Sequence, residues 1–146
     1  MSAKAVAERL GGRSVLRREI NSELELAEAV RAGLPSTALD HLMEELASWT
    51  GSAADVYRVV GSARTLQRKR ARRAALSADE SDRLARLARL LVRAEAALGD
   101  TEKAHRWLSR PNRALGGRRP LTLLDSDAGA LAVERVLGRI EHGVYS

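Results

Sequence analysis

The stretch LSADESDRLARLARLLVRAEAALGD, residues 76–100, decides the fold. Ser77 is followed three residues later by Glu80, the pattern of a capping box that begins a helix. Gly99 is typical of a residue that ends one. Between them, leucines recur on one helical face, at Leu84, Leu87, Leu91 and Leu98. The stretch therefore predicts the longest helix of the chain, with an apolar face that other elements must cover.

Helical spacing recurs on both sides of this stretch. The pattern predicts a helix over 3–10, one that Ser22 and Glu25 begin and that runs to about Arg31, and one over about 37–48. A helix that Ser52 caps and a basic helix from about Ala63 follow. Beyond residue 100 we expect a short helix after Asp100, a loop, and a last helix from about Ser126 that Gly143 ends. The sequence thus predicts an all-α fold.

The composition agrees with packed helices. Apolar residues make up 45% of the 146 residues, aromatic residues only 3%, and Phe is absent. A core of Leu, Val and Ala favours helices over a sandwich or barrel. The absence of cysteine excludes disulfides and thiolate metal sites. No apolar run approaches the roughly 18 residues of a membrane span. Residues 1–12 lack a signal-peptide core, so we expect a cytoplasmic protein without membrane contact.

The net charge of +6 is unevenly placed. No acidic residue lies between Asp55 and Asp79, and the remaining 18 basic residues nearly balance the 19 acidic residues. The gap holds seven cations: Arg58, Arg64, Arg68, Lys69, Arg70, Arg72 and Arg73. Such a concentrated patch suits a polyanion, and a solvated helix face is the alternative.

Residues 37–73 have the length and order of a helix-turn-helix whose last helix is basic. Arg, Thr and Gln side chains reach base edges or phosphates, and Lys and Arg neutralise the DNA backbone. The candidate DNA contacts are Arg64, Thr65, Gln67, Arg68, Lys69 and Arg70.

Catalytic motifs are missing from the sequence. His41, His105 and His142 lie far apart, and none has a second ligand at metal spacing. No phosphate-binding loop, nucleophile elbow or zinc-protease motif occurs. We therefore expect a protein that is not an enzyme and that holds no metal and no cofactor.

Three residues follow the helix stop at Gly143: Val144, Tyr145 and Ser146. They are too few for another element, yet a Tyr side chain is favoured in binding pockets. The tail either enters a partner or packs on the surface of its own chain.

Several spaced motifs occur in order: LSADESDRL (76–84), KAHRWLSRPNRALGGRRPLTLL (103–124), DAGALAVERVLGRIEHG (127–143) and the closing VYS. Together they resemble the toxin-binding domain of the Xre/MbcA/ParS-type antitoxins. AGLPSTALDHLMEEL and VYRVVGSARTLQRKR resemble the helix-turn-helix half of the same antitoxins. The resemblance covers about residues 30–146 and implies three parts: an N-terminal helical segment (1–35), an Xre-like helix-turn-helix (36–75) and a toxin-binding domain (76–146).

The resemblance also implies a function. Its members act in type II toxin–antitoxin systems against RES-domain toxins, NAD-degrading relatives of ADP-ribosyltransferases. The antitoxin covers the toxin's active site, commonly dimerises, and represses its own operon by binding operator DNA. The toxin-binding residues would be Arg139, Glu141, His142, Gly143, Val144, Tyr145 and Ser146. The alternative is a stand-alone helix-turn-helix transcription regulator.

Overall fold

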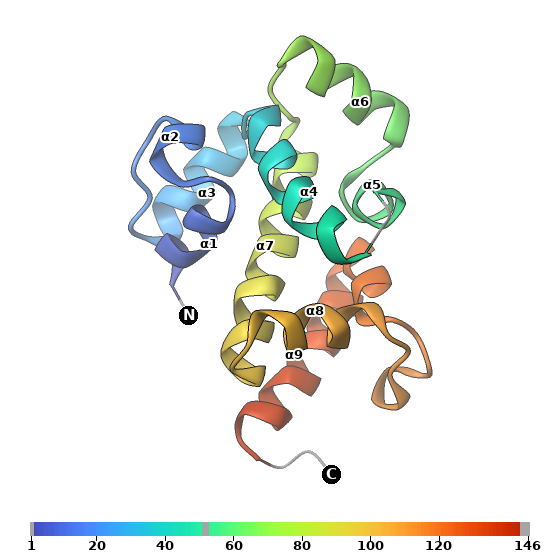
Figure 1. The fold of residues 1–146 in the computed structure, drawn as a ribbon. Helices are drawn as coiled ribbons and strands as arrows, with labels where there is room; N and C mark the ends of the chain where they lie inside the picture. The colour runs from blue at the N-terminus through green and yellow to red at the C-terminus, as the bar shows by residue number, and fades with distance from the viewer. Residues whose placement is uncertain (1, 51–52, 144–146) are drawn as a thin grey trace.

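The computed structural model describes residues 2–50 and 53–143, and within these ranges it contains helices and no strand. Figure 1 shows their arrangement. The elements are α1 (Ala3–Arg9), α2 (Gly12–Leu16), α3 (Glu23–Ala32), α4 (Ser36–Thr50), α5 (Ala54–Val60), α6 (Ala63–Arg72), α7 (Ala78–Leu98), α8 (Thr101–Ser109), the 3₁₀ turns η1 (Arg113–Leu115) and η2 (Pro120–Asp125), and α9 (Asp127–Glu141). The all-α prediction is confirmed.

Helix α7 is the central element. Ser77 and Glu80 form the expected capping box, and Gly99 ends the helix in the left-handed conformation. Leu84, Leu87 and Leu91 of its leucine face are fully buried and Leu98 is partly buried. Helices α1, α3, α5, α8 and α9 all pack against α7 (Figure 1). Fully burying a leucine side chain contributes about 1.5–3 kcal/mol, so this face supplies much of the stability.

The helix-turn-helix consists of α4, α5 and α6. Ser62 caps α6 by accepting a hydrogen bond from the Thr65 backbone N–H, and Leu66 is fully buried beneath it. Tyr57 is buried on α5, and its hydroxyl accepts a hydrogen bond of 2.8 Å from Arg70. The predicted cap at Ser52 lies outside the described residues.

The predicted boundary between residues 75 and 76 falls just before α7. The chain is tied together across it, because the Leu76 N–H donates to the Leu34 carbonyl and the Leu34 N–H donates to the Ser81 hydroxyl, each at 2.8 Å. Since α7 also packs against helices from both sides of the boundary, the two halves share one core.

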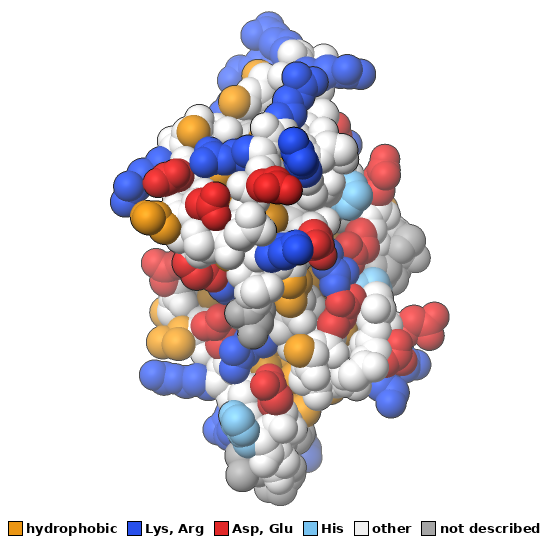
Figure 2. Space-filling view, turned by 90° about the vertical axis from the view of Figure 1, so that its left-hand side faces the viewer, with side chains coloured by type: hydrophobic (Ala, Val, Ile, Leu, Met, Phe, Trp, Pro, Cys, Tyr) orange, Lys and Arg blue, Asp and Glu red, His pale blue; other side chains and the backbone are white. Residues whose placement is uncertain are grey.

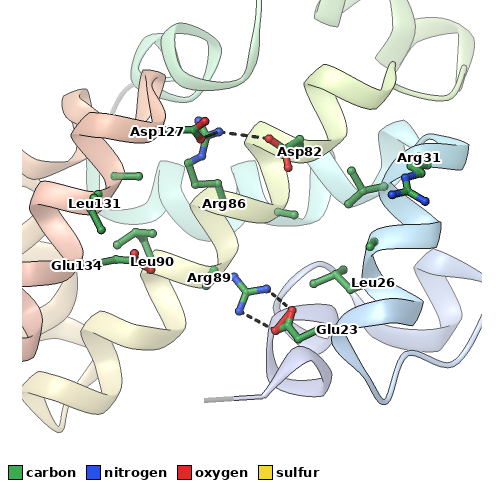
Figure 3. A pocket seen from close by; sticks show the side chains of 14 residues that line it. Glu23, Leu26, Arg31, Asp82, Arg86, Arg89, Leu90, Asp127, Leu131 and Glu134 are labelled. Atoms are coloured by element: carbon green, nitrogen blue, oxygen red, sulfur yellow. Dashed lines mark hydrogen bonds and ion pairs between the residues drawn. The ribbon is translucent and has the colours of Figure 1, made fainter.

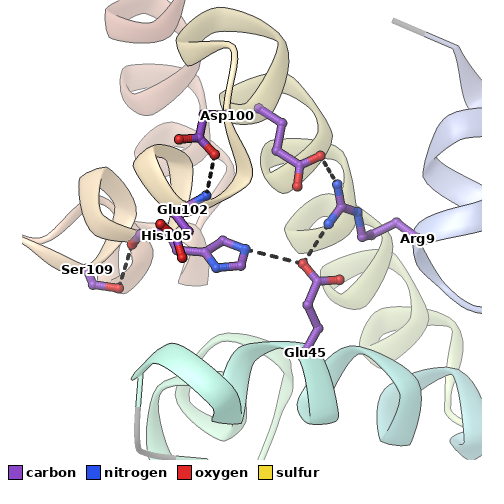
Figure 4. Close-up of polar contacts among 7 residues, drawn as sticks. Arg9, Glu45, Asp100, Glu102, His105 and Ser109 are labelled. Atoms are coloured by element: carbon purple, nitrogen blue, oxygen red, sulfur yellow. Dashed lines mark hydrogen bonds and ion pairs between the residues drawn. The ribbon is translucent and has the colours of Figure 1, made fainter.

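A charged cluster joins the N-terminal segment to the rest of the chain (Figure 4). The Arg9 guanidinium donates to Glu45 of α4 at 2.6 Å and to Glu95 of α7. His105 of α8 places its Nε2 3.5 Å from the Glu45 carboxylate and is only 7% exposed. Four helices thus meet around one guanidinium, which anchors α1 to the rest of the fold.

Burial lowers the pKa of His105 to about 4, with Arg9 adding to the effect and Glu95 and Asp100 opposing it. The folded state therefore favours the neutral imidazole. The resulting stability is present above the ordinary pKa of 6.5 and is lost as the pH falls from there toward 4.

We expect the free energy of unfolding to depend less on pH below 6.5 in His105→Gln than in the wild-type chain, because Gln cannot take up a proton. Between pH 6.5 and about 4, the free energy of unfolding of the wild-type chain should fall by up to about 3 kcal/mol more than that of the variant. Urea unfolding of both proteins at a series of pH values measures the free energy of unfolding. Both proteins contain the same carboxylates, so the difference between the two profiles reports the titration of His105. Parallel profiles would contradict the assignment.

Candidate functional site

The solvent-facing side of α6 carries half of the predicted DNA contacts. Arg64, Gln67 and Arg68 are exposed, and Thr65 is half-buried with its N–H used by the Ser62 cap. Arg58, Arg72 and Arg73 are exposed nearby in the sequence. Basic side chains gather at the top of Figure 2, the end of the molecule that α6 occupies in Figure 1. This end therefore presents cations and hydrogen-bond donors to a polyanion.

The other two predicted contacts have partners within the chain. Lys69 donates to Glu80 at 2.5 Å, and Arg70 donates to Asp40 and to the Tyr57 hydroxyl. Burial alone would raise the pKa of Glu80, but Lys69 and the Ser77 backbone N–H outweigh it and hold the pKa below its ordinary value. Lys69 and Arg70 thus fasten α6 to α7 and α4, a role that the sequence pattern did not reveal.

A sharp corner leads into α9 and sets its direction. Ser126 caps the helix by accepting from the Gly129 N–H at 3.0 Å. A Cβ at Gly129 would lie only 1.9 Å from the Leu123 carbonyl oxygen, so only glycine fits there. From this corner, Val133, Val136 and Leu137 bury the inner face of α9. The corner and the buried face together fix where the last turn of α9 lies.

The last turn of α9 extends beyond the rest of the fold (Figure 1). Arg139, Glu141, His142 and Gly143 are all exposed. Gly143 takes a left-handed φ of 71° and donates its N–H to the Ile140 carbonyl at 3.1 Å, as expected of a helix stop. The predicted contacts Val144, Tyr145 and Ser146 lie outside the described residues.

A bidentate ion pair joins α5 to the segment before α9. Arg119, at the start of η2, donates to both carboxylate oxygens of Asp55 on α5, at 2.9 and 3.1 Å. The two residues are 64 positions apart in the sequence, and no local pattern pairs them. The segment before α9 is therefore fastened to the helix that precedes α6.

One cluster offers ligand atoms of a kind that metal ions bind. Ligand atoms of Glu45, Glu95 and His105 lie within 4.8 Å of one another. The Arg9 guanidinium already bonds both carboxylates, so a metal ion would have to displace it. The cluster is better explained as a structural ion-pair network, and the sequence missed its His because the partners come from distant helices.

Known proteins match both halves of the chain. Residues 25–89 match the family model of the antitoxin Xre-like helix-turn-helix domain, and residues 93–143 match that of the antitoxin Xre/MbcA/ParS C-terminal toxin-binding domain. No helix among the described residues has the length and apolarity needed to span a bilayer.

Curated relatives extend the match over most of the chain. Antitoxin Xre of Photorhabdus laumondii is 38% identical over 117 residues, 78% of this chain and 76% of that protein. Antitoxin Xre of Yersinia enterocolitica is 34% identical over 125 residues, 83% and 81% of the two chains. The Prs ADP-ribosylating antitoxin of a Sphingobium species is 34% identical over 91 residues, 56% and 57% of the two chains. With both domains matched in order and the Xre relatives aligned over more than three quarters of its length, the chain belongs to the Xre family of toxin–antitoxin antitoxins.

Proposed function

We propose that this antitoxin acts in a type II system against a RES-domain toxin, an NAD-degrading relative of ADP-ribosyltransferases. Its C-terminal region blocks the toxin's active site, and α6 binds operator DNA so that the operon is repressed. It acts by occupying space and needs neither cofactor nor metal. The observation that carries the proposal is the exposed end of α9, which is held rigidly by its corner but buries none of its last polar side chains.

The end of α9 suits a plug for an anion-binding cleft. Arg139, Glu141 and His142 offer polar contacts at the rim of the cleft, while the left-handed Gly143 turns the backbone out of the helix axis. Val144 to Ser146 then enter the cleft and occupy the space that NAD would take. Most of the affinity comes from the wider helical surface, because three residues bury too little area for a stable complex.

We expect deletion of residues 144–146 to leave the toxin complex intact but to release NAD degradation. Tyr145→Ala should release part of it, since an aromatic anchor contributes about 2 kcal/mol or more, whereas Tyr145→Phe keeps the ring and serves as the matched control. The measurement is NAD loss by the toxin at saturating antitoxin, with complex formation followed separately. Full inhibition by the truncated chain would show that the helix faces, not the tail, close the cleft.

Operator binding is proposed for the exposed side of α6. Helix-turn-helix proteins commonly bind as dimers to two half-sites, so the proposal includes a homodimer within the toxin–antitoxin complex. Arg64, Gln67 and Arg68 are the contacts that remain free to reach DNA, while Lys69 and Arg70 contribute by holding the helix in place.

We expect Arg64→Ala and Arg68→Ala each to weaken operator binding. A lost base contact costs about 1–3 kcal/mol, and a lost phosphate contact lowers the salt slope by about 1. Fluorescence anisotropy with operator DNA over a salt series measures both. Arg106→Ala, an exposed arginine of α8, is the matched control.

Arg70→Ala should behave differently from these variants. It frees Asp40 and the Tyr57 hydroxyl, so the melting temperature of the free protein should fall. If Arg64→Ala and Arg68→Ala bind the operator like wild type, the basic side of α6 is a solvated face, and the proposal for DNA is wrong.

A further inference from the structure

A groove of about 650 Å³ runs along one side of α7, with α3 and α9 as its walls (Figure 3). Leu26, Leu90 and Ala130 line it together with other apolar side chains, and ion pairs hold its walls in place. Arg89 of α7 bonds both carboxylate oxygens of Glu23 on α3, at 2.7 and 2.8 Å. Arg86 of α7 bonds Asp127 on α9. The groove is thus a preformed feature with a braced shape.

The two walls expose apolar side chains to solvent. Among the described residues, the large hydrophobic side chains that remain exposed are Leu24, at 67%, and Leu131, at 46%. One belongs to α3 and the other to α9, the two helices that flank the groove. Leu131 lines the groove and, with the exposed Ala128 and Arg135, forms one ridge of α9. A ridge of this kind, beside an apolar groove, is the signature of a docking surface.

The charges on the two helices match each other in order and spacing. Along α3, Glu23 and Arg31 flank Leu26, and along α9, Asp127 and Arg135 flank Leu131. Each pair is separated by eight residues, about 12 Å along a helix. Arg31 and Asp127 lie at the same end of the groove in Figure 3, so α3 and α9 run antiparallel. If an α9 lies against α3 in this direction, an acidic side chain of one helix meets a basic side chain of the other at both ends of the groove.

From this match we propose that the occupant of the groove is α9 of a second copy of this chain, which forms the homodimer of the proposed function. A two-fold axis parallel to the groove leaves α3 and α9, which run along it, pointing the same way in both copies, and each α9 then enters the groove of the other copy. The second copy's Asp127, which already bonds its own Arg86, meets Arg31, and the second copy's Arg135 meets Glu23, which already bonds Arg89, so that each acid lies between two arginines. The second copy's Leu131 covers the apolar lining. The contact is self-complementary, as a two-fold interface requires.

The arrangement leaves the proposed functional surfaces accessible. A two-fold axis along the groove places α6 of both copies at the same end of the dimer, because α6 lies at one end of α7 (Figure 1). Arg139 and His142 lie one turn or more beyond Arg135, past the portion of α9 that the groove engages. The inference therefore rests on the homodimer of the proposed function. It assigns this homodimer a surface distinct from the contacts named for DNA on α6 and for the toxin at the end of α9.

The first test measures self-association of the free antitoxin by sedimentation, without toxin or DNA. Leu131→Glu should raise the dissociation constant of the dimer by about tenfold or more, as loss of an apolar anchor does. Arg31→Glu and Arg135→Glu should also weaken it, while Arg106→Glu, the same charge reversal on α8, should not. All four sites are exposed, so circular dichroism should show unchanged folding. A dimer that forms equally well in all variants, or a wild-type chain that stays monomeric, would overturn the proposal.

The second test uses the absence of cysteine from the chain. Arg31→Cys protein mixed with Asp127→Cys protein should cross-link through a short bis-maleimide to a heterodimer, and more efficiently than Arg31→Cys mixed with Arg106→Cys. Equal yields in both mixtures would reject the geometry. If Leu131→Glu keeps the free dimer but loses the toxin in a pull-down, the groove belongs to the toxin and the inference is wrong. Because neither association assay contains DNA or toxin, failure here leaves the plug and the operator contacts to their own tests.

Discussion

Burial of the leucine face of α7 is the interaction on which the rest of the structure depends. With no Phe, no Cys and only two Trp and two Tyr, the chain has few aromatic rings and no disulfides to organise its core. The leucines that α7 buries are therefore covered mainly by aliphatic side chains from other helices. Helices from both halves of the chain provide this cover, so the surfaces proposed for DNA and for the toxin are both built on α7.

Charged side chains then fix how the covering helices are oriented. Arg9, Arg86, Arg89 and Arg119 each reach a carboxylate on a different helix or turn. The pairs of Arg9 and Arg119 are partly buried, and breaking such a pair leaves an unpaired charge and is costly. These two pairs therefore act chiefly by penalising alternative packings, whereas the pairs of Arg86 and Arg89 are exposed and add less. An aliphatic core tolerates many arrangements of similar volume, and the arginine pairs select one of them.

Local chemistry was predictable from the sequence, and long-range pairing was not. The capping box at Ser77 and Glu80, the cap at Ser126 and the stop at Gly99 depend on residues within four positions of each other, so the sequence displays them directly. The partners of Lys69 and Arg70 lie 11 and 30 positions away, and only the fold brings them together. Spacing therefore identified α6 as a basic helix but could not separate the arginines that face solvent from the cations that hold the helix. The braced groove was missed for the same reason, since its walls lie about a hundred residues apart.

The bond between Arg9 and Glu95 has a consequence for the order in which the chain is made. The two residues are 86 positions apart, and α7 lies at the far end of that interval. At the usual 5–20 residues per second, α1 leaves the ribosome roughly 4–17 seconds before its partner exists. During that interval the apolar faces of α1 to α6 have no α7 to cover them. The nascent chain therefore carries unburied apolar surface until α7 has been made, and its fold can close only late in translation.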